Sequence, residues 1–175
     1  MTKQKSPTSE SAEDLHSRIK NLEKELRETT ARLSHHTARE KRFQDAIDNS
    51  STGYFFLDAD GYFRRANPAL AKMLGYSRKE DLLGQHFAET QAEESLDIAH
   101  KQFRSVLLGK RIISDLTTMI RVDGTRLFAR FSSNPVFDGE RPIGAEGFLI
   151  DISEQVETEI ALRQSEERFR AICEH

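Results

Sequence analysis

The amino-acid sequence predicts an α+β domain with a five-stranded antiparallel sheet, its helices on one face, and a long helix before and after it. The central part of the chain contains two short β-prone segments, then several helical segments, then three longer β-prone segments. Turn sequences of the Asp-Gly type follow two of these β-prone segments, as is typical of antiparallel hairpins. Because strands and helices are grouped rather than alternating, the helices are expected to gather on one side of the sheet.

The first two strands are predicted as a hairpin within residues 53–65. Residues 53–57 (GYFFL) are aromatic and β-prone, residues 58–61 (DADG) form a turn sequence, and residues 62–65 (YFRR) resume a strand. This alternation of β-prone and turn residues is the sequence signature of a hairpin.

Three helices are predicted between this hairpin and the remaining strands. Asn67 is an N-cap residue with Pro68 at the first helical position, and Gly75 ends that helix. A capping box at residues 77–80 (SRKE) begins a short helix that ends near Gly84. The longest helix spans residues 92–108, and its predicted inward face is formed by Leu96, Ala99, Phe103 and Leu107.

Three further strands are predicted over residues 112–122, 126–136 and 143–152. The first two are joined by an Asp123-Gly124 turn, and the last two by a loop at residues 137–142. A capping box at residues 151–154 (DISE) begins the charged helix that follows.

The N-terminal part of the chain is predicted to be a disordered tail over residues 1–10, followed by a coiled-coil helix over residues 11–38. Apolar residues alternate at spacings of four and three, as in the a and d positions of a parallel dimer. The predicted dimer seam consists of Leu15, Ile19, Leu22, Leu26 and Leu33. The alternative is a single amphipathic helix packed on the domain. In the same register His36 and Glu40 fall on seam positions, so the seam is expected to weaken and end there.

The composition excludes several classes of function. The chain has 175 residues, a net charge of −3 and a pI near 6.1, so it lacks the basic field that nucleic acid or an anionic membrane would require. Its single cysteine, Cys173, allows no disulfide framework within the chain, which favours a reducing, cytoplasmic location. No apolar segment is long enough to span a bilayer, so no membrane contact is expected.

Several motifs occur in an order that resembles the PAS family, in the variant called the sensory box. They are Arg42-Phe-Gln-Asp-Ala-Ile47, Leu57-Asp-Ala-Asp-Gly61, Ala66-Asn-Pro-Ala69, Met73-Leu-Gly-Tyr-Ser77, Arg121-Val-Asp-Gly124 and Gly147-Phe-Leu-Ile-Asp-Ile-Ser-Glu154. The resemblance covers residues 39–153 and implies the PAS fold. It also implies that Asp151, Ile152 and Ser153 couple the last strand to the exit helix, although the family usually has Thr where Ser153 stands.

Residues 165–175 (SEERFRAICEH) repeat the pattern of residues 39–49 (REKRFQDAIDN), which precede the predicted domain. Residues 154–175 are therefore predicted to be a signalling helix that leads into a truncated second PAS domain of a longer bacterial receptor.

The resemblance also implies a pocket between the sheet and the long helix. Strand alternation and the inward helix face predict a mainly apolar lining, made of Phe55, Leu57, Met73, Phe103, Leu127, Ala129, Phe131 and Ser133. The small side chains of Ala129 and Ser133 would leave room for a modest ligand. The alternative is that these residues only fill the core.

No cofactor is predicted. Light-sensing relatives use a flavin-reactive cysteine in the helical segment, and this sequence has no cysteine before Cys173 and no tryptophan to stack on a flavin. Haem-binding relatives use an inward histidine on the long helix, but His100 lies at the edge of the predicted inward face. His86 is expected to cap or pack a short helix.

No catalytic residue and no metal site are predicted, so the fragment is not expected to be an enzyme. The His35-His36 tract is too short for a metal site, and no glycine-rich phosphate loop is present. The preferred function is a sensory input module that relays a stimulus or small ligand, through dimeric helices, to an output domain farther along the chain. The alternative is a ligand-free dimerisation or spacer PAS module within a sensor histidine kinase or diguanylate cyclase.

Overall fold

A computed structural model describes the backbone of residues 12–173 and the side chains of residues 16–170. The predicted disordered tail, residues 1–10, therefore lies outside the described residues. The chain divides into two compact units, one ending at Asp45 and the other beginning at Ala46. Each unit is described by itself.

The N-terminal unit consists of helix α1 (Ala12–Asp48), whose last three residues belong to the second unit. The helix is unbroken through residues 34–40, so it does not end with the predicted coiled-coil segment at residue 38. Its large apolar side chains are exposed: Ile19, Leu22, Leu26 and Leu33 are 53–68% accessible. The side chain of Leu15 lies outside the described side chains. The dimer seam therefore stays a prediction, which is based on the heptad pattern.

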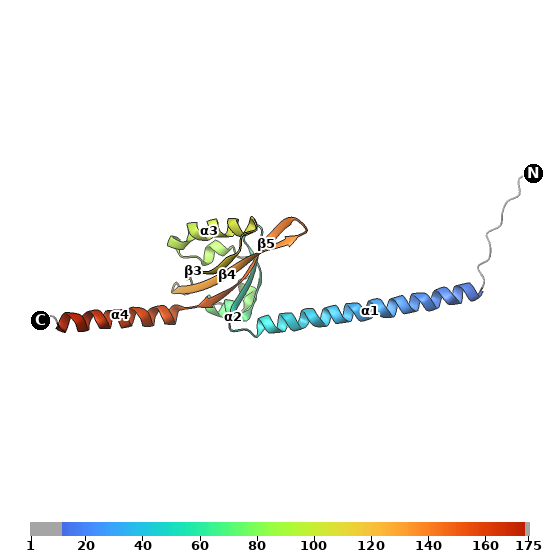
Figure 1. Cartoon of the computed structure of the whole chain (residues 1–175), viewed down its shortest axis with the longest axis horizontal. Coiled ribbons are helices and arrows are strands. Elements are labelled where there is room, and N and C mark those ends of the chain that lie inside the picture. Colours follow the sequence, from blue (N-terminus) through green and yellow to red (C-terminus); the bar gives the residue numbers. More distant parts are fainter. Residues whose placement is uncertain (1–11, 174–175) are drawn as a thin grey trace, which may run out of the picture. The chain divides into compact units, whose positions relative to one another are not determined.

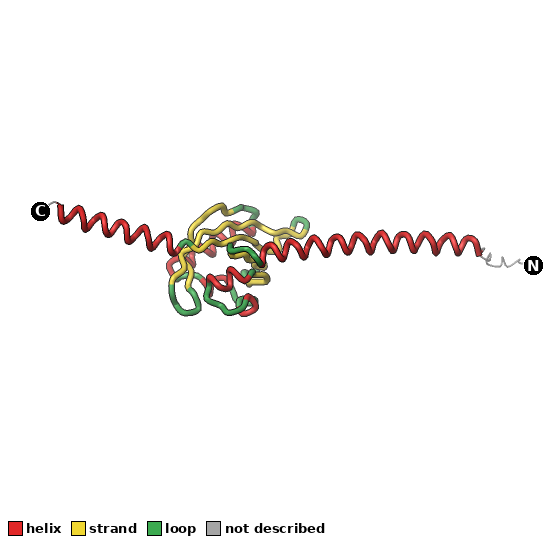
Figure 2. The backbone as a smooth tube through the Cα atoms, turned by 90° about the horizontal axis from the view of Figure 1, so that it is seen from below, coloured by secondary structure: helices red, strands yellow, loops and turns green. Residues whose placement is uncertain are grey.

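The second unit contains a five-stranded antiparallel sheet with the strand order β2-β1-β5-β4-β3 (Figures 1 and 2). The strands are β1 (Gly53–Asp58), β2 (Phe63–Ala66), β3 (Ile112–Ile120), β4 (Arg126–Asp138) and β5 (Arg141–Asp151). The last strand in the chain, β5, pairs with β1 and β4 and so occupies the centre of the sheet. This arrangement confirms the predicted five-stranded antiparallel sheet.

Four helical segments lie between β2 and β3, and helix α4 (Ser153–Cys173) follows β5. They are α2 (Pro68–Met73), the 3₁₀ helices η1 (Lys79–Asp81) and η2 (Phe87–Thr90), and α3 (Glu93–Leu107). Helix α2 packs on β1, and α3 packs across β3, β4 and β5 (Figure 1). The core joins these helices to the sheet through residues that include Leu70, Leu74, Leu127 and Leu149.

Two local predictions differ from the structure. The N-cap of η1 is Arg78 rather than Ser77, and its side chain makes no capping bond, because the segment forms one 3₁₀ turn instead of an α-helix. The predicted loop at residues 137–142 is a tight hairpin, since Asp138 pairs with Arg141 and Gly139 takes the φ of +60° that the turn requires. The short helix that His86 is expected to cap or pack is present as η2.

Candidate functional site

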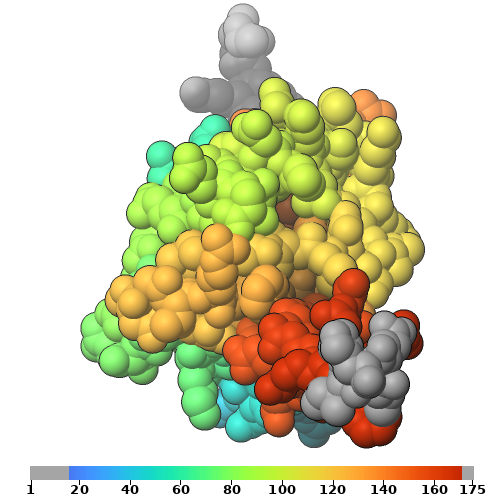
Figure 3. Space-filling view, turned by 90° about the vertical axis from the view of Figure 1, so that its left-hand side faces the viewer, coloured from blue at the N-terminus to red at the C-terminus, as the bar shows by residue number. Residues whose placement is uncertain are grey.

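A cavity of about 80 Å³ lies between the helices and the sheet. All strands contribute to its wall, together with α2, η2 and α3. Its lining residues are Phe55, Leu57, Phe63, Leu70, Phe87, Gln91, Ala99, Gln102, Phe103, Val106, Ile112, Thr117, Met119, Phe131, Ser133 and Leu149. In Figure 3 a small hollow is visible between the yellow-green α3 and the gold and orange strands.

Five of the eight predicted pocket residues line this cavity: Phe55, Leu57, Phe103, Phe131 and Ser133. The other three do not, which corrects the prediction. Leu127 and Ala129 face the same side of the sheet but are fully buried in the core cluster, and Met73 packs against that cluster at the end of α2. Strand alternation identifies the side of the sheet that a residue faces, but it does not give the distance along the strand at which a cavity lies.

The inward face of α3 is also rotated from its prediction. Ala99 and Phe103 line the cavity as expected, whereas Leu96 and Leu107 do not, and Gln102 and Val106 take their place. Val106 is the only fully buried residue of this helix. Because Gln102 is polar, hydrophobic periodicity could not assign it to the inward face.

The polar lining residues are hydrogen-bonded to nearby groups of the fold. The Thr117 hydroxyl donates to Gln91 Oε1 over 2.9 Å, and the Ser133 hydroxyl donates to the Glu146 carbonyl over 3.3 Å. The Gln102 amide nitrogen donates to the Asp115 carboxylate on β3. No lining residue carries a charge, so the wall is apolar apart from amide and hydroxyl groups.

Neither of the two histidines considered at the sequence level lines the cavity. His86 caps η2, as expected: its Nδ1 accepts the Ala88 N–H over 3.2 Å, and the Glu89 carboxylate completes a capping box. His100 lies at the edge of α3, and its ring centre is 5.1 Å from that of Phe87. His100 therefore contacts a residue of the cavity wall without itself lining the cavity.

The predicted relay residues lie where β5 joins α4. The Ser153 N–H donates to Asp151 Oδ1 over 2.8 Å, and the Ser153 hydroxyl accepts the Phe128 N–H of β4 over 3.1 Å. The Ile152 N–H donates to the Phe128 carbonyl over 2.8 Å, and the Ile152 side chain is buried. The first turn of α4 is thus fixed to β4 by side-chain and main-chain bonds.

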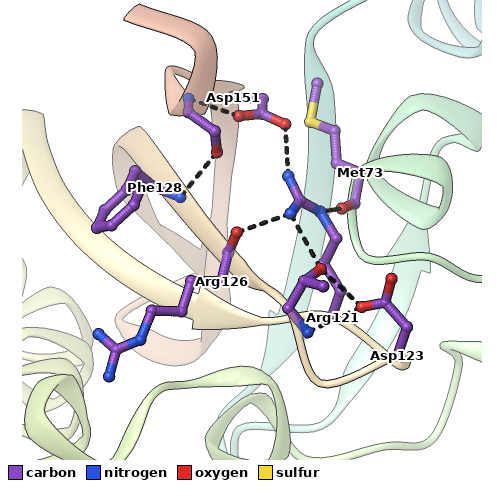
Figure 4. Close-up of polar contacts among 8 residues, drawn as sticks. Met73, Arg121, Asp123, Arg126, Phe128 and Asp151 are labelled. Atoms are coloured by element: carbon purple, nitrogen blue, oxygen red, sulfur yellow. Dashed lines mark hydrogen bonds and ion pairs between the residues drawn. The ribbon is translucent and has the colours of Figure 1, made fainter. Parts of the chain in front are cut away.

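Arg121, at the end of β3, connects this junction to helix α2 (Figure 4). Its guanidinium donates to the Met73 carbonyl over 2.9 Å, to the Arg126 carbonyl over 2.7 Å, and to Asp151 Oδ2 over 3.0 Å. The Arg121 and Asp151 side chains are 22% and 32% exposed, so the ion pair is only partly screened by water. Sequence reasoning placed Arg121 in a family motif but did not identify this role.

The β3–β4 turn that carries Arg121 is itself held by hydrogen bonds. The side chain of Asp123 accepts from the Thr125 hydroxyl over 2.6 Å and from the Thr125 N–H over 2.9 Å. These bonds lower the pKa of Asp123 below its ordinary value. The turn is thereby held in the geometry that presents the Arg121 guanidinium to Asp151.

The described residues form neither a metal site nor a membrane-spanning helix. No group of three or more His, Cys, Asp or Glu side chains in residues 16–170 is arranged to hold a metal ion. No helix in the described part of the chain has the length and apolar content needed to span a lipid bilayer.

Comparison with known proteins places these features in a family. A family model for the PAS fold matches residues 41–152, whereas no curated protein matches the chain. A PAS domain from Colwellia psychrerythraea shares 20% identity, with 65% of this chain and 97% of that chain covered and a TM-score of 0.59. A domain of a sensory box sensor histidine kinase/response regulator from Geobacter sulfurreducens shares 19% identity, with 65% and 94% covered and a TM-score of 0.55.

An RNA-binding Light-Oxygen-Voltage receptor shares 26% identity with this chain over 73% of its length, with a TM-score of 0.60, and the match covers 37% of the receptor. The structural neighbours thus have the same fold. Since the family match extends over more than half of the residues, the chain belongs to the PAS family.

Proposed function

We propose that this PAS domain is a non-catalytic sensory input module in which the state of the core cavity controls helix α4 through Arg121. The observation that carries the proposal is the guanidinium of Arg121, which bonds both the Met73 carbonyl of α2 and the Asp151 carboxylate at the start of the exit helix. Helix α2 also places Leu70 in the cavity wall. A change in the cavity that displaces α2 would therefore alter the bonds that hold α4.

In the complete receptor, the relay would continue through a dimer of helices to an output domain. The exposed apolar stripe of α1 supports a parallel homodimer, because a helix that exposes leucines at heptad spacing is stabilised when a second copy covers them. The pattern of residues 165–175 supports a second PAS domain following α4. A cytoplasmic location and a histidine kinase or diguanylate cyclase output are parts of the same proposal.

The proposed module uses neither haem nor flavin. A cavity of about 80 Å³ is smaller than a cavity of roughly 150 Å³ that holds benzene, and both cofactors are far larger than benzene. His100 is not among the lining residues, and no cysteine precedes Cys173. These observations support a module that uses neither group.

The test is to fill the cavity by mutation and observe α4. Ala99→Leu adds volume to a lining position of α3, whereas Asp97→Leu adds it on the exposed face of the same helix and serves as the matched control. Hydrogen exchange of the amides in the first turn of α4 is then measured with and without Arg121→Gln.

We expect Ala99→Leu to change the exchange rates at Ile152–Val156 by about tenfold, equivalent to about 1.4 kcal/mol of local opening free energy. The change should disappear in the double variant with Arg121→Gln, and Asp97→Leu should leave the rates as in the parent chain. The relay is refuted if filling the cavity leaves α4 unaffected, or if the change persists without Arg121.

A further inference from the structure

Each of the two glutamines of the cavity wall has a side-chain amide with two ends, a carbonyl oxygen and a nitrogen. In each glutamine one end is hydrogen-bonded within the fold and the other is not. Gln91 Oε1 accepts from the Thr117 hydroxyl, and its amide nitrogen makes no bond to another described residue. Gln102 has the opposite arrangement. Its nitrogen donates to the Asp115 carboxylate, which can only accept, so the Gln102 carbonyl oxygen is the free end.

The bonded ends of both glutamines lie against the same strand. Thr117 and Asp115 both belong to β3, so each glutamine is held against that strand by its bonded end. Gln91 and Gln102 are half-buried, and both line the cavity. The residues of the cavity wall therefore include one amide donor and one amide acceptor that have no partner among the described residues, where α3 meets β3.

The remainder of the wall restricts the ligand further. No lining side chain is charged, so an ion would lose its hydration without gaining a counter-charge. The opposite wall is formed by aromatic and aliphatic side chains, among them Phe55, Phe131 and Leu149. A volume of about 80 Å³ limits an unadjusted guest to fewer atoms than benzene.

We propose that the cavity binds a small uncharged molecule with a carboxamide-type edge, its carbonyl accepting from Gln91 Nε2 and its N–H donating to Gln102 Oε1. The small apolar part of the ligand packs on the aromatic wall. This inference rests on the proposed function, in which the cavity is the sensory site, and it adds the chemical class of the ligand. A ligand that fills the cavity but leaves the Gln91 nitrogen or the Gln102 oxygen without a hydrogen bond is unfavourable. The two glutamines therefore select among ligands of equal size by their hydrogen-bonding groups.

The experiment uses three probes of nearly equal size on the ¹⁵N-labelled 175-residue chain, followed by NMR titration. Acetamide has both a donor and an acceptor, acetone has only an acceptor, and acetate is charged. We expect acetamide to bind with a Kd on the order of 1 mM, as its few atoms allow, with shifts centred on Ala99 and Phe103. Acetone should bind about tenfold more weakly, and acetate should leave these signals unchanged.

Variants of the glutamines identify the groups responsible. Gln102→Met should weaken acetamide about tenfold and leave acetone binding as it is, whereas Gln91→Met should weaken both probes. Asp115→Ala is the control, since it removes the partner of Gln102 but keeps the carbonyl oxygen. Asp115→Ala should keep the acetamide affinity within about twofold of that of the parent chain. The amide spectrum of each variant shows whether that variant is folded.

The inference is overturned if the three probes bind alike, if acetamide shifts only surface residues, or if both methionine variants retain full acetamide affinity. These results are distinguishable from failure of the proposed function. If Ala99→Leu changes α4 but acetamide does not bind, only the proposed ligand class is wrong. If acetamide binds but α4 does not respond to Ala99→Leu, the proposed sensory relay is wrong.

Discussion

The two sides of the domain core differ in how completely their side chains are buried. On the side where α2 packs against β1, the side chains of Asn67, Leu70, Leu74 and Leu82 are at most 1% exposed. On the side where α3 packs against β3, Val106 is the only fully buried residue of a 15-residue helix. The same sheet thus has one closely packed wall and one that is more loosely packed.

Asn67 is the main polar anchor of the closely packed wall. Its carbonyl oxygen accepts from the Tyr54 N–H over 2.8 Å and from the Leu70 N–H over 3.0 Å. Its amide nitrogen donates to the carbonyls of Ile47 and Thr52 over 2.9 and 2.8 Å. One fully buried side chain therefore joins the end of α1, the start of β1 and the first turn of α2.

Two hydrogen bonds join the start of α3 to β3. The Ala92 N–H donates to the Thr118 carbonyl over 3.0 Å, and the Thr118 N–H donates to the Ser95 hydroxyl over 3.3 Å. Strand β3 is irregular between Ile112 and Asp115, and Ser114 has a φ of +57°, as in a β-bulge. A region with few fully buried apolar side chains, such as α3, is expected to open at low free energy.

The two walls are therefore suited to different roles in the proposed relay. The α3 wall, which carries Gln102 and most of the polar lining, is suited to adjust to a ligand. The α2 wall, which carries Leu70 and presents the Met73 carbonyl to Arg121, is suited to transmit a displacement without absorbing it. Three stability measurements test this difference between the walls.

The largest effect is expected for Asn67→Ala. Loss of four hydrogen bonds in a fully buried position should lower the free energy of unfolding by about 3 to 4 kcal/mol, measured by urea denaturation. Asn134→Ala, on an exposed position of β4, is the control and should change it by less than about 0.5 kcal/mol. A loss below about 1 kcal/mol for Asn67→Ala would show that the anchor contributes little.

A pair of leucine truncations compares the two walls directly. Leu74→Ala removes a side chain that is 0% exposed at the end of α2 and should destabilise the domain by about 3 kcal/mol. Leu96→Ala removes a half-buried side chain on α3 and should have an effect of about 1 kcal/mol. Equal losses in thermal or urea unfolding would contradict the distinction between the walls.

The smallest effect is expected at Asp58, at the end of β1. Burial raises the pKa of its carboxyl, but hydrogen bonds from the Tyr62 N–H and the Arg64 guanidinium outweigh this and lower it below the ordinary value. Because the folded-state pKa is lowered, the stabilisation is present at neutral pH and is lost as the pH falls below about 4 through the folded-state pKa.

Asp58→Asn should therefore reduce the free energy of unfolding by about 1 kcal/mol at pH 7, since the charged partner of Arg64 is lost. The difference between the two proteins should shrink as the pH is lowered below about 4, where the parent carboxyl becomes neutral as well. Urea denaturation of both proteins across this pH range measures it. A difference that is constant with pH would mean that the carboxylate charge has no part in the stability of the turn.

Local signals in the sequence predicted local structure well. Asn67 with Pro68 predicted the N-terminus of α2, and the Asn67 side chain does accept the Leu70 N–H. The Ser77 capping box failed, because whether a short segment forms an α-helix or a single 3₁₀ turn depends on the packing around it rather than on its own residues.

The candidate site was predicted in part for the same reason. Alternation along β1 and β4 identified Phe55, Phe131 and Ser133 as inward residues of the cavity. The pairing of Gln102 with Asp115 and the contacts of Arg121 were not predicted, because they join residues that lie far apart in the sequence or on different elements. No periodic pattern within one segment reports such a distance.

Patterns within short segments were enough to predict the order of the strands and main helices, the heptad stripe of α1 and the resemblance to the PAS family. The side chains that surround the cavity and the group that connects α2 to α4 could be read only from the folded structure. Turn and helix signals act over a few residues, whereas a cavity is the space left when whole elements pack. The observed inward face of α3 is turned by about 55° from the predicted one, roughly half of the 100° step per residue, so Val106 rather than Leu107 lines the cavity.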